Sequence, residues 1–449
     1  ILNEIRRLKV IRGVLVVKNR KDWEDLRCAN QEMLQIKDKI LIPWFQSNEI
    51  VAIQGNTNIF VYGEDDDCAG KEPLKMRKRT RRTIIKQLEN TGISASKAYE
   101  LVEDTHGLYI PLKKKLLKGS YEKKPAWANN DLELTLPLLM CGRWTEAEGD
   151  KTVLEELTGK KYEEILEKIR PYVLGEDPLL VTYKRHGKVF WQLASLENGW
   201  DYLGLKIDVN GKLWKQFIEL LFEILIETDP VFEFPEKEQH VRRIMPEGQA
   251  FWSKEIRHGM LRSLIMKAFY QQDKEGQYSA DQVTRKIFGH IKNAKQWQSI
   301  APYFQELCEV SPDVVMKRLE EEWDSPSGLL AIFKRGEGNY STYERYDYTH
   351  ILWGIEQFLL QRQYAARAVR WLFQLSEENI SYAMSNSPDD VLANVFCPWI
   401  NLTALTHNEK IELANEMAKT YKNGWDLLYV ELPEQKIMVM GDMVHPKYR

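Results

Sequence analysis

The sequence, 449 residues long, lacks several features that mark common classes of protein. Its five cysteines lie at least forty residues apart, so they form no CxxC pair and suit reduced thiols better than a disulfide framework. The longest apolar run, 217–226, is well short of the roughly 18 residues that cross a bilayer, and it contains Glu219 and Glu223. We therefore expect a cytoplasmic protein without a membrane span.

An excess of charge of one sign is also missing. Lys plus Arg number 63 and Asp plus Glu number 66, for a net charge of −3. This balance excludes a globally basic nucleic-acid coat and an acidic disordered tail. The first residue is Ile1, not Met, and charged sequence of ordered texture follows it. We therefore expect the 449 residues to be part of a longer polypeptide.

Catalytic signatures are missing too. The sequence has no GxxxxGK[ST], GxGxxG, HExxH or GxSxG pattern, and no two of its eight histidines are three or four residues apart. The residues thus predict neither a catalytic centre nor a metal site, and whether the complete protein is an enzyme stays open. The acidic run 64–67, beside a predicted strand, either binds a divalent cation or is a solvated loop without an ion.

What is present indicates a mainly α-helical protein of several domains. Hydrophobic residues make up 43% of the sequence and aromatic residues 11%, which excludes extensive disorder. Residues 1–72 differ from the rest, because Val- and Ile-rich runs at 13–17, 40–45, 50–53 and 58–62 predict strands, with a helix over 22–37. This order predicts the C-terminal part of an α/β domain.

Residues 73–125 have a helical pattern and a strongly basic start. Seven basic residues lie between 75 and 86, which suits either a polyphosphate or nucleic-acid backbone or a solvated helix face. Ser94 or Ser96 is expected to cap a helix that runs through Val102, and a further helix over 108–117 has Pro111 in its first turn. The turn 105–107 between them either leaves backbone N–H groups and His106 for an anion, or is an ordinary turn with a surface histidine.

Residues 126–206 have the order of a winged helix. We expect helices over 132–139 and 162–170, a helix capped by 149–151 that runs through Leu157, and a hairpin of 179–184 and 189–193. Residues 142–144 are predicted to be a turn, and Pro171 is predicted to follow the last helix. That helix carries three Glu residues, which repel phosphate, so nucleic-acid binding is not expected.

Residues 207–449 are predicted to be an α-solenoid-like array of irregular helix pairs. Apolar residues recur at i, i+3 and i+4 over 213–228, 253–271, 280–292, 297–310, 312–322, 348–360, 364–375 and 409–421. Aromatic side chains dominate protein interfaces, so we expect a protein partner here. The predicted contacts are Tyr340, Tyr343 and Tyr346 in a loop and Trp353 and Trp371 on helices, where the alternative for each Trp is a core position.

The order of these parts resembles a STAND-type (NACHT-like, NLR-like) P-loop NTPase. Residues 79–82 resemble the opening of the family's helical lid, and 98–108 with Pro111 are similar to its helix ending in a Gly-x-Pro-like turn. Residues 141–144 with Asp150, Lys151 and Leu157 resemble the start of its winged helix. The whole design is similar to bacterial antiviral sensors such as the Avs group. Two departures are the missing phosphate-binding loop and magnesium Asp, and a turn two residues longer than Gly-x-Pro.

The resemblance implies the regulatory and sensor portion of a nucleotide-switched anti-phage protein. ATP or ADP with magnesium would be held mainly by residues outside this chain, with these residues of the lid turned toward it: Arg79, Arg81, Arg82, His106, Gly107 and Pro111. A protein ligand, such as a phage protein, would bind the helical array and release an oligomerisation surface. Two alternatives are a non-enzymatic helical scaffold with a winged-helix interaction module, and a DNA-binding regulator.

Overall fold

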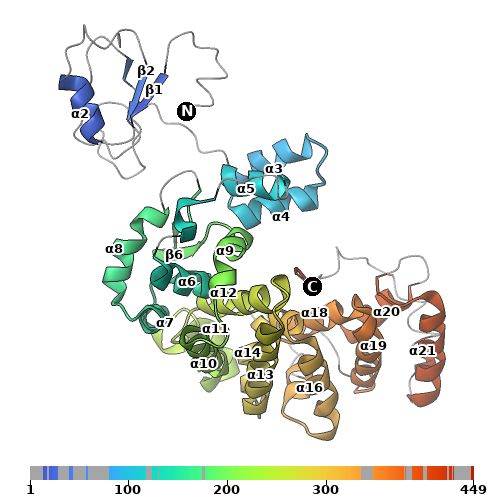
Figure 1. The fold of residues 1–449 in the computed structure, drawn as a ribbon. Helices are drawn as coiled ribbons and strands as arrows, with labels where there is room; N and C mark the ends of the chain where they lie inside the picture. The colour runs from blue at the N-terminus through green and yellow to red at the C-terminus, as the bar shows by residue number, and fades with distance from the viewer. Residues whose placement is uncertain are drawn as a thin grey trace. The chain divides into compact units, whose positions relative to one another are not determined.

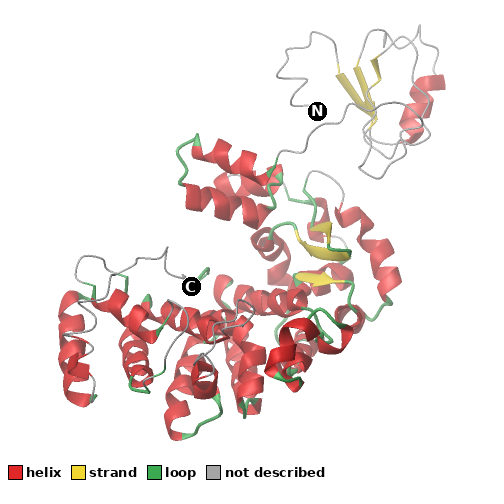
Figure 2. Ribbon diagram, turned by 180° about the vertical axis from the view of Figure 1, so that it is seen from behind, coloured by secondary structure: helices red, strands yellow, loops and turns green. Residues whose placement is uncertain are grey.

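The computed structural model is mainly helical (Figure 1; Figure 2). It describes residues 14–17, 20–28, 40–43, 57–58, 80–117, 124–129, 131–173, 177–334, 347–378, 380, 387–397, 402–421, 424–426, 428 and 446–448. The chain divides into two compact units, Ile1–Thr80 and Arg81–Arg449. Within the described ranges, no helix combines the length and the apolar character needed to cross a membrane.

The first unit contains a parallel sheet. Its described elements are β1 (Val14–Val17), α2 (Arg20–Cys28), β2 (Ile40–Pro43) and β3 (Thr57–Asn58), and the strand order is β1-β2-β3. Val14 pairs with Ile40, and Ile40 pairs with Thr57. Trp23 and Leu41 are fully buried, as expected where a helix covers a parallel sheet. The strand-helix-strand prediction is thus confirmed, while the runs 50–53 and 64–67 lie outside the described residues.

The second unit begins with a small bundle of α3 (Arg81–Glu89), α4 (Ala95–Thr105) and α5 (Tyr109–Leu117), which we call the α3–α5 bundle. Ser94, not Ser96, caps α4, and its hydroxyl accepts from the backbone N–H of Lys97. The bundle has a core of its own, formed by Leu88, Ala98, Leu101, Val102 and Leu112. The basic residues 75–79 lie outside the described part of the chain.

The next segment combines helices with an antiparallel sheet. After the 3-10 turn Ala126–Asn129, its elements are α6 (Leu132–Cys141), β4 (Arg143–Thr145), α7 (Glu148–Thr158), α8 (Tyr162–Val173), β5 (Leu180–Arg185), β6 (Lys188–Leu193) and α9 (Leu196–Leu203). The sheet order is β4-β6-β5. His186 and Gly187 have φ angles of 49° and 77°, which is the geometry of a tight hairpin turn. The predicted hairpin is therefore confirmed.

Three local predictions in this segment are wrong. Residues 143–145 are a strand, not a turn, because Trp144 pairs with Trp191 across the sheet. Helix α8 continues past Pro171 to Val173. Helix α7 begins at Glu148, and Asp150 does not cap it: its buried carboxylate accepts from the backbone N–H and hydroxyl of both Thr145 and Ser253.

Eight of the helices that follow in the described ranges pack in two rows. The row α12–α15–α18–α20 contacts neighbours in that order, and so does the row α13–α16–α19–α21, whose helices lie side by side in Figure 1. The described elements are the short helix Gly204–Lys206, α10 (Lys212–Ile226), Pro230–Glu233, α11 (Glu236–Arg242), Pro246–Gly248, α12 (Lys254–Ile265) with the π-helical turn Met266–Tyr270, α13 (Lys274–His290), α14 (Ala294–Ile300), Ala301–Tyr303, α15 (Phe304–Val310), α16 (Pro312–Asp324), α17 (Leu329–Lys334), α18 (Asp347–Leu359), α19 (Arg362–Ser376), α20 (Pro388–Phe396), α21 (His407–Thr420) and α22 (Gly424–Asp426).

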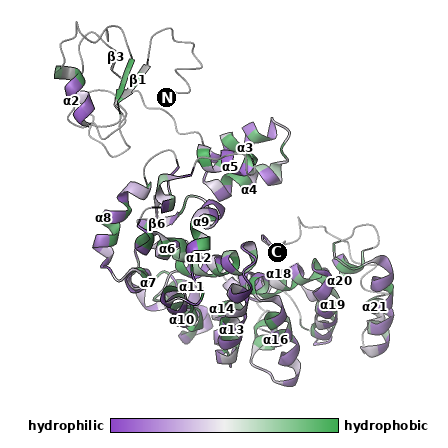
Figure 3. Cartoon of the chain, viewed as in Figure 1, coloured by the Kyte–Doolittle hydropathy of each residue, from purple (hydrophilic) through white to green (hydrophobic). Residues whose placement is uncertain are grey.

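One continuous apolar core joins the segment after Ala126 to these rows. It extends from Trp127 to Met417 and is separate from the core of the α3–α5 bundle. Most of the helices that build it carry both hydrophobic and hydrophilic residues (Figure 3), whereas α6 is apolar along most of its length and buried from Leu134 to Cys141 except at Leu136. The predicted domain limit at 206 and 207 therefore lies within a shared core, whereas the limit at 125 and 126 lies between two cores.

Candidate functional site

A polar cavity of about 100 Å³ lies where the α3–α5 bundle meets the rest of the second unit, and we call it the junction cavity. The end of α4 and part of α5 form one wall, and the β4–β6 sheet, α9 and α12 form the other. The polar side chains that line it are Glu103, Asp104, His106, Lys115, Arg143, Gln192, Ser195, Glu197, Arg262, Lys447 and Tyr448. One residue predicted to face a nucleotide, His106, thus lines this cavity.

The turn after α4 does not present free donors to an anion. His106 has a left-handed φ of 51° and Gly107 a φ of 69°. The backbone N–H of Gly107 donates to Val102 at 3.0 Å, and that of Leu108 donates to Thr105 at 2.9 Å. These bonds close the C-terminus of α4 in the usual way for a left-handed cap. Of the two alternatives for this turn, the ordinary interhelical turn therefore describes its backbone, because the helix end already uses the N–H groups of Gly107 and Leu108.

His106 connects the bundle to the sheet. Its Nδ1 lies 3.2 Å from Nε2 of Gln192, on β6. Burial, and then the positive charge of Arg81, lower the pKa of His106 below its ordinary value. Both effects favour the neutral ring, which makes a hydrogen bond across the junction. Pro111 is buried in the first turn of α5 and forms no part of the cavity wall.

The arginines predicted to sense phosphate have different surroundings. Arg81 donates from Nη1 to both carboxylate oxygens of Glu103, at 2.7 and 2.9 Å, so its charge is already matched. Arg82 is exposed and forms no ion pair with any described residue. Arg79 lies outside the described residues. Of the predicted set, only His106 lines the junction cavity directly.

Ion pairs of low exposure fasten the bundle to its surroundings. Lys115 of α5 contacts Asp104 of α4 and, at 2.9 Å, Glu197 of α9. Lys447 also pairs with Asp104, although the two are 343 residues apart in sequence. Burial alone would raise the pKa of Asp104, but Lys115 and Lys447 lower it below the usual value. Burial opposes the charge of Lys115, yet Asp104 and Glu197 raise its pKa.

Two arginines on the far wall were missed by the sequence predictions. The Nε of Arg143 is buried without a hydrogen-bond partner, and burial followed by the nearby Arg262 lowers the pKa of this guanidinium. Arg262 lies 3.8 Å from Glu306, whose carboxylate is held more closely by His258 at 2.7 Å. No sequence signal could have paired them, since one is on a strand after a glycine and the other on α12.

The aromatic residues expected to bind a partner are only partly described. Trp371 is buried, with 2% exposure, and its Nε1 donates to the carbonyl of Leu319. It therefore belongs to the core, which corrects the prediction of a surface contact. Trp353 is half-buried and packs against His350. Tyr340, Tyr343 and Tyr346 lie outside the described residues.

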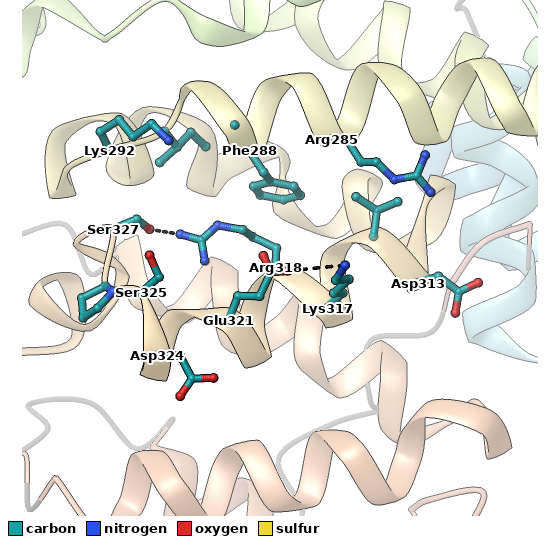
Figure 4. Close-up of a pocket in the computed structure, with 14 residues that line it drawn as sticks. Arg285, Phe288, Lys292, Asp313, Lys317, Arg318, Glu321, Asp324, Ser325 and Ser327 are labelled. Atoms are coloured by element: carbon teal, nitrogen blue, oxygen red, sulfur yellow. Dashed lines mark hydrogen bonds and ion pairs between the residues drawn. The ribbon is translucent and has the colours of Figure 1, made fainter.

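A larger groove, of about 730 Å³, lies between α13 and α16 (Figure 4). Arg318 points into it, where it donates to Glu322 at 2.9 Å and to Ser327. Arg285 and Lys292, on α13, form no ion pair with any described residue. By contrast, bidentate pairs close the next contact in the row, between Arg367 of α19 and Glu320 of α16, at 2.7 Å for both bonds.

No group of three or more His, Cys, Asp or Glu side chains in the described ranges is arranged to hold a metal ion. The acidic run 64–67, the one candidate for a divalent cation, lies outside those ranges. Comparisons with protein-family models, with curated proteins and with solved structures found no match for the chain.

Proposed function

We propose that these residues are the regulatory and sensor portion of a STAND-type, nucleotide-switched anti-phage defence protein that acts in the cytoplasm. The observation that carries the proposal is the attachment of the α3–α5 bundle. It has its own small core and is fastened by ion pairs and hydrogen bonds, including Lys115 to Glu197, Lys114 to Asp177 and His106 to Gln192. Polar contacts between separate cores are typical of parts that move relative to one another.

The order of the parts supports the same proposal. The parallel sheet of the first unit suits the end of an α/β nucleotide-binding domain, and the α3–α5 bundle suits its lid. The segment from α6 to β6 suits a winged helix whose wing is the β5–β6 hairpin. The two rows of helices suit an α-solenoid sensor.

The effect of a ligand that binds to the helical rows could be transmitted to the junction through packed structure. The core from Trp127 to Met417 is continuous, so the winged-helix segment and the rows move together. Glu309 of α15 accepts from the backbone N–H of Tyr448, and the adjacent Lys447 pairs with Asp104 of the bundle. Ligand binding would open the junction only as far as the ligand prefers the open state.

ATP or ADP with magnesium stays part of this proposal, but the described residues offer little to hold it. The backbone donors of the turn 105–107 are used by α4, and Arg81 is paired with Glu103. The nucleotide would therefore be held by residues outside this chain. Arg82 is the predicted contact that stays unpaired among the described residues.

The test uses the complete protein that contains this chain. Fluorescent ADP and ATP are titrated, and oligomer size is followed by mass photometry. Lys115→Met should weaken the junction and raise the oligomer fraction with ATP, whereas Lys97→Met, which removes an exposed pair with Glu100 within α4, should not. The proposal fails if the folded protein binds no nucleotide, or if the two variants behave alike.

A non-enzymatic scaffold is the second candidate, and the groove between α13 and α16 favours it, because Arg285 and Lys292 have no ion-pair partner among the described residues. Partner binding that is independent of nucleotide and is lost on Arg285→Glu would support it. DNA binding has less support, since Glu163, Glu164 and Glu167 are exposed on α8.

A further inference from the structure

Arg143 and Arg262 are two like-charged side chains on the wall of the junction cavity. Arg143 is in no ion pair with a described carboxylate, although Glu255 and Glu306 act on its charge, and Arg262 has a 3.8 Å contact with Glu306. Arg143 follows Gly142 at the start of β4, and Arg262 is one helical turn beyond Gly259 on α12. From this arrangement we infer that the junction cavity binds a phosphate group, held between Arg143 and Arg262. The inference does not rest on the proposed nucleotide switch, because every residue it uses belongs to the described part of this chain.

Close approach of two glycines brings the arginines together. A Cβ atom on Gly259 would lie 2.1 Å from the carbonyl oxygen of Cys141 and 2.8 Å from the backbone nitrogen of Arg143. A Cβ atom on Gly142 would lie 3.1 Å from the carbonyl oxygen of Gly259. Helix α12 therefore packs directly on the backbone before β4. Since β4 is held by β6, Arg143 cannot move away without breaking the sheet.

The carboxylates of the cavity wall are already paired with other cations. Glu103 accepts from Arg81, Asp104 pairs with Lys115 and Lys447, and Glu197 pairs with Lys115. Of the cations on the other wall, Arg143 forms no ion pair with a described carboxylate, and Arg262 has only the 3.8 Å contact with Glu306, which His258 holds at 2.7 Å. A buried guanidinium without a hydrogen-bonded counter-charge is costly, and an anion between the two would satisfy both.

The chemistry of the wall suits a tetrahedral oxyanion. A guanidinium donates two parallel hydrogen bonds to oxygens of one phosphate. Ser195 adds a hydroxyl to the wall, and Lys447 adds a second class of cation. The two arginines thus lie on one wall of the cavity, and the side chains of the other wall are neutral or already paired.

The size and access of the cavity limit what it binds. Its volume is about 100 Å³, whereas one water needs roughly 10–15 Å³ of such space. A group of five heavy atoms thus fits, but a nucleoside does not. Arg262 is 43% exposed, so the cavity opens to solvent beside it. The ligand is either free inorganic phosphate or the terminal phosphate of a larger molecule that stays outside.

The test titrates inorganic phosphate into the 449-residue chain by calorimetry, at constant ionic strength set with chloride. We expect saturable binding to one site that is at least tenfold weaker in Arg143→Gln and in Arg262→Gln. Arg285→Gln is the matched control, because it removes an exposed arginine of the same unit that lies outside the junction cavity and forms no ion pair with a described residue. It should leave phosphate binding unchanged.

Two results would overturn the inference: no saturable binding, or equal affinity in the wild type and both cavity variants. Circular dichroism checks folding, and Arg262→Gln keeps the test decisive if Arg143→Gln does not fold, because Arg262 is the more exposed of the two. A parallel titration with ADP identifies the source. Tighter binding of ADP with the same dependence on Arg262 indicates a terminal phosphate, and binding of inorganic phosphate alone indicates the free ion.

Discussion

Replacing Lys115 with methionine should release the α3–α5 bundle from the rest of the second unit. The ammonium of Lys115 contacts Asp104 within the bundle and Glu197 outside it, and its side chain is 12% exposed. Methionine keeps most of the length and apolar character of the lysine stem but removes the charge. Asp104 keeps Lys447 as a partner, whereas Glu197, at 26% exposure, loses its paired cation and must be hydrated.

The expected magnitude follows from how completely each partner is left unpaired. Removing one member of a fully buried pair costs about 3–5 kcal/mol. Because Asp104 stays paired and Glu197 reaches solvent, we expect about half of that, or about 2 kcal/mol. That free energy corresponds to roughly a 30-fold increase in the population with the junction open.

Hydrogen exchange of backbone amides measures this opening directly. A bundle with five buried core residues is too small to be stable alone, so amides of α4 and α5 should exchange when the junction opens. Their protection should fall roughly 30-fold, while amides of α12 and α15 should not change. Lys97→Met is the control and should alter protection by less than about 0.5 kcal/mol. Unchanged protection of α4 and α5 in Lys115→Met would refute the reasoning.

Three further predictions concern pH, a turn and a buried carboxylate. The lowered pKa of Asp104 means that its contribution is present above its unfolded value and is lost as pH falls through the lower folded value. Junction opening measured by exchange should thus rise below about pH 4, as Asp104 is protonated. The lowered pKa of His106 adds a separate rise that begins as pH falls below the ordinary histidine value of about 6.5; opening that does not increase below pH 4 would contradict the role of Asp104. Gly107→Ala should destabilise the bundle by about 1–2 kcal/mol, since φ of Gly107 is 69° and the new Cβ would lie 2.8 Å from Cδ1 of Ile84. Gly289→Ala is the control, because a Cβ at Gly289 would have open space around it and should not destabilise the protein. Equal losses of unfolding free energy for the two variants in urea would contradict this prediction. Asp150→Ala should lower the free energy of unfolding by about 3 kcal/mol, because the buried N–H groups of Thr145 and Ser253 lose their hydrogen-bond acceptor. Urea unfolding followed by tryptophan fluorescence measures this loss. A much smaller loss would mean that those N–H groups find other partners.

Local sequence signals predicted most of the regular structure. Ser94 caps α4, Ser311 and Pro312 begin α16, and His186 with Gly187 closes the hairpin. These elements depend on the conformational preferences of neighbouring residues, which a sequence shows directly. Amphipathic spacing likewise located the long helices of the two rows, although α20, with the capping box of Ser387 and Asp390, went unpredicted.

Elements held by distant partners were predicted less well. Residues 143–145 form a strand only because β6 lies beside them. Asp150 accepts a hydrogen bond from the backbone N–H of Ser253, which is distant in sequence, and does not cap its own helix. The turn 105–107 had the right composition for an anion site, yet α4 uses its donors. In each case a tertiary contact changed the role that local sequence indicated.

The candidate site likewise combines features that local sequence predicts with contacts that only the fold creates. By itself, the sequence determined a mainly helical protein, a parallel strand-helix-strand segment near the start and two helices joined by the turn 105–107, because these depend on periodicity and on turn residues. Only the tertiary structure decided that Asp104 meets a lysine 343 residues away, that Trp371 is core, and that Arg143 and Arg262 line the same cavity. Charged groups have no periodic signal, and whether a cation is paired depends on what the fold brings within a few ångströms of it.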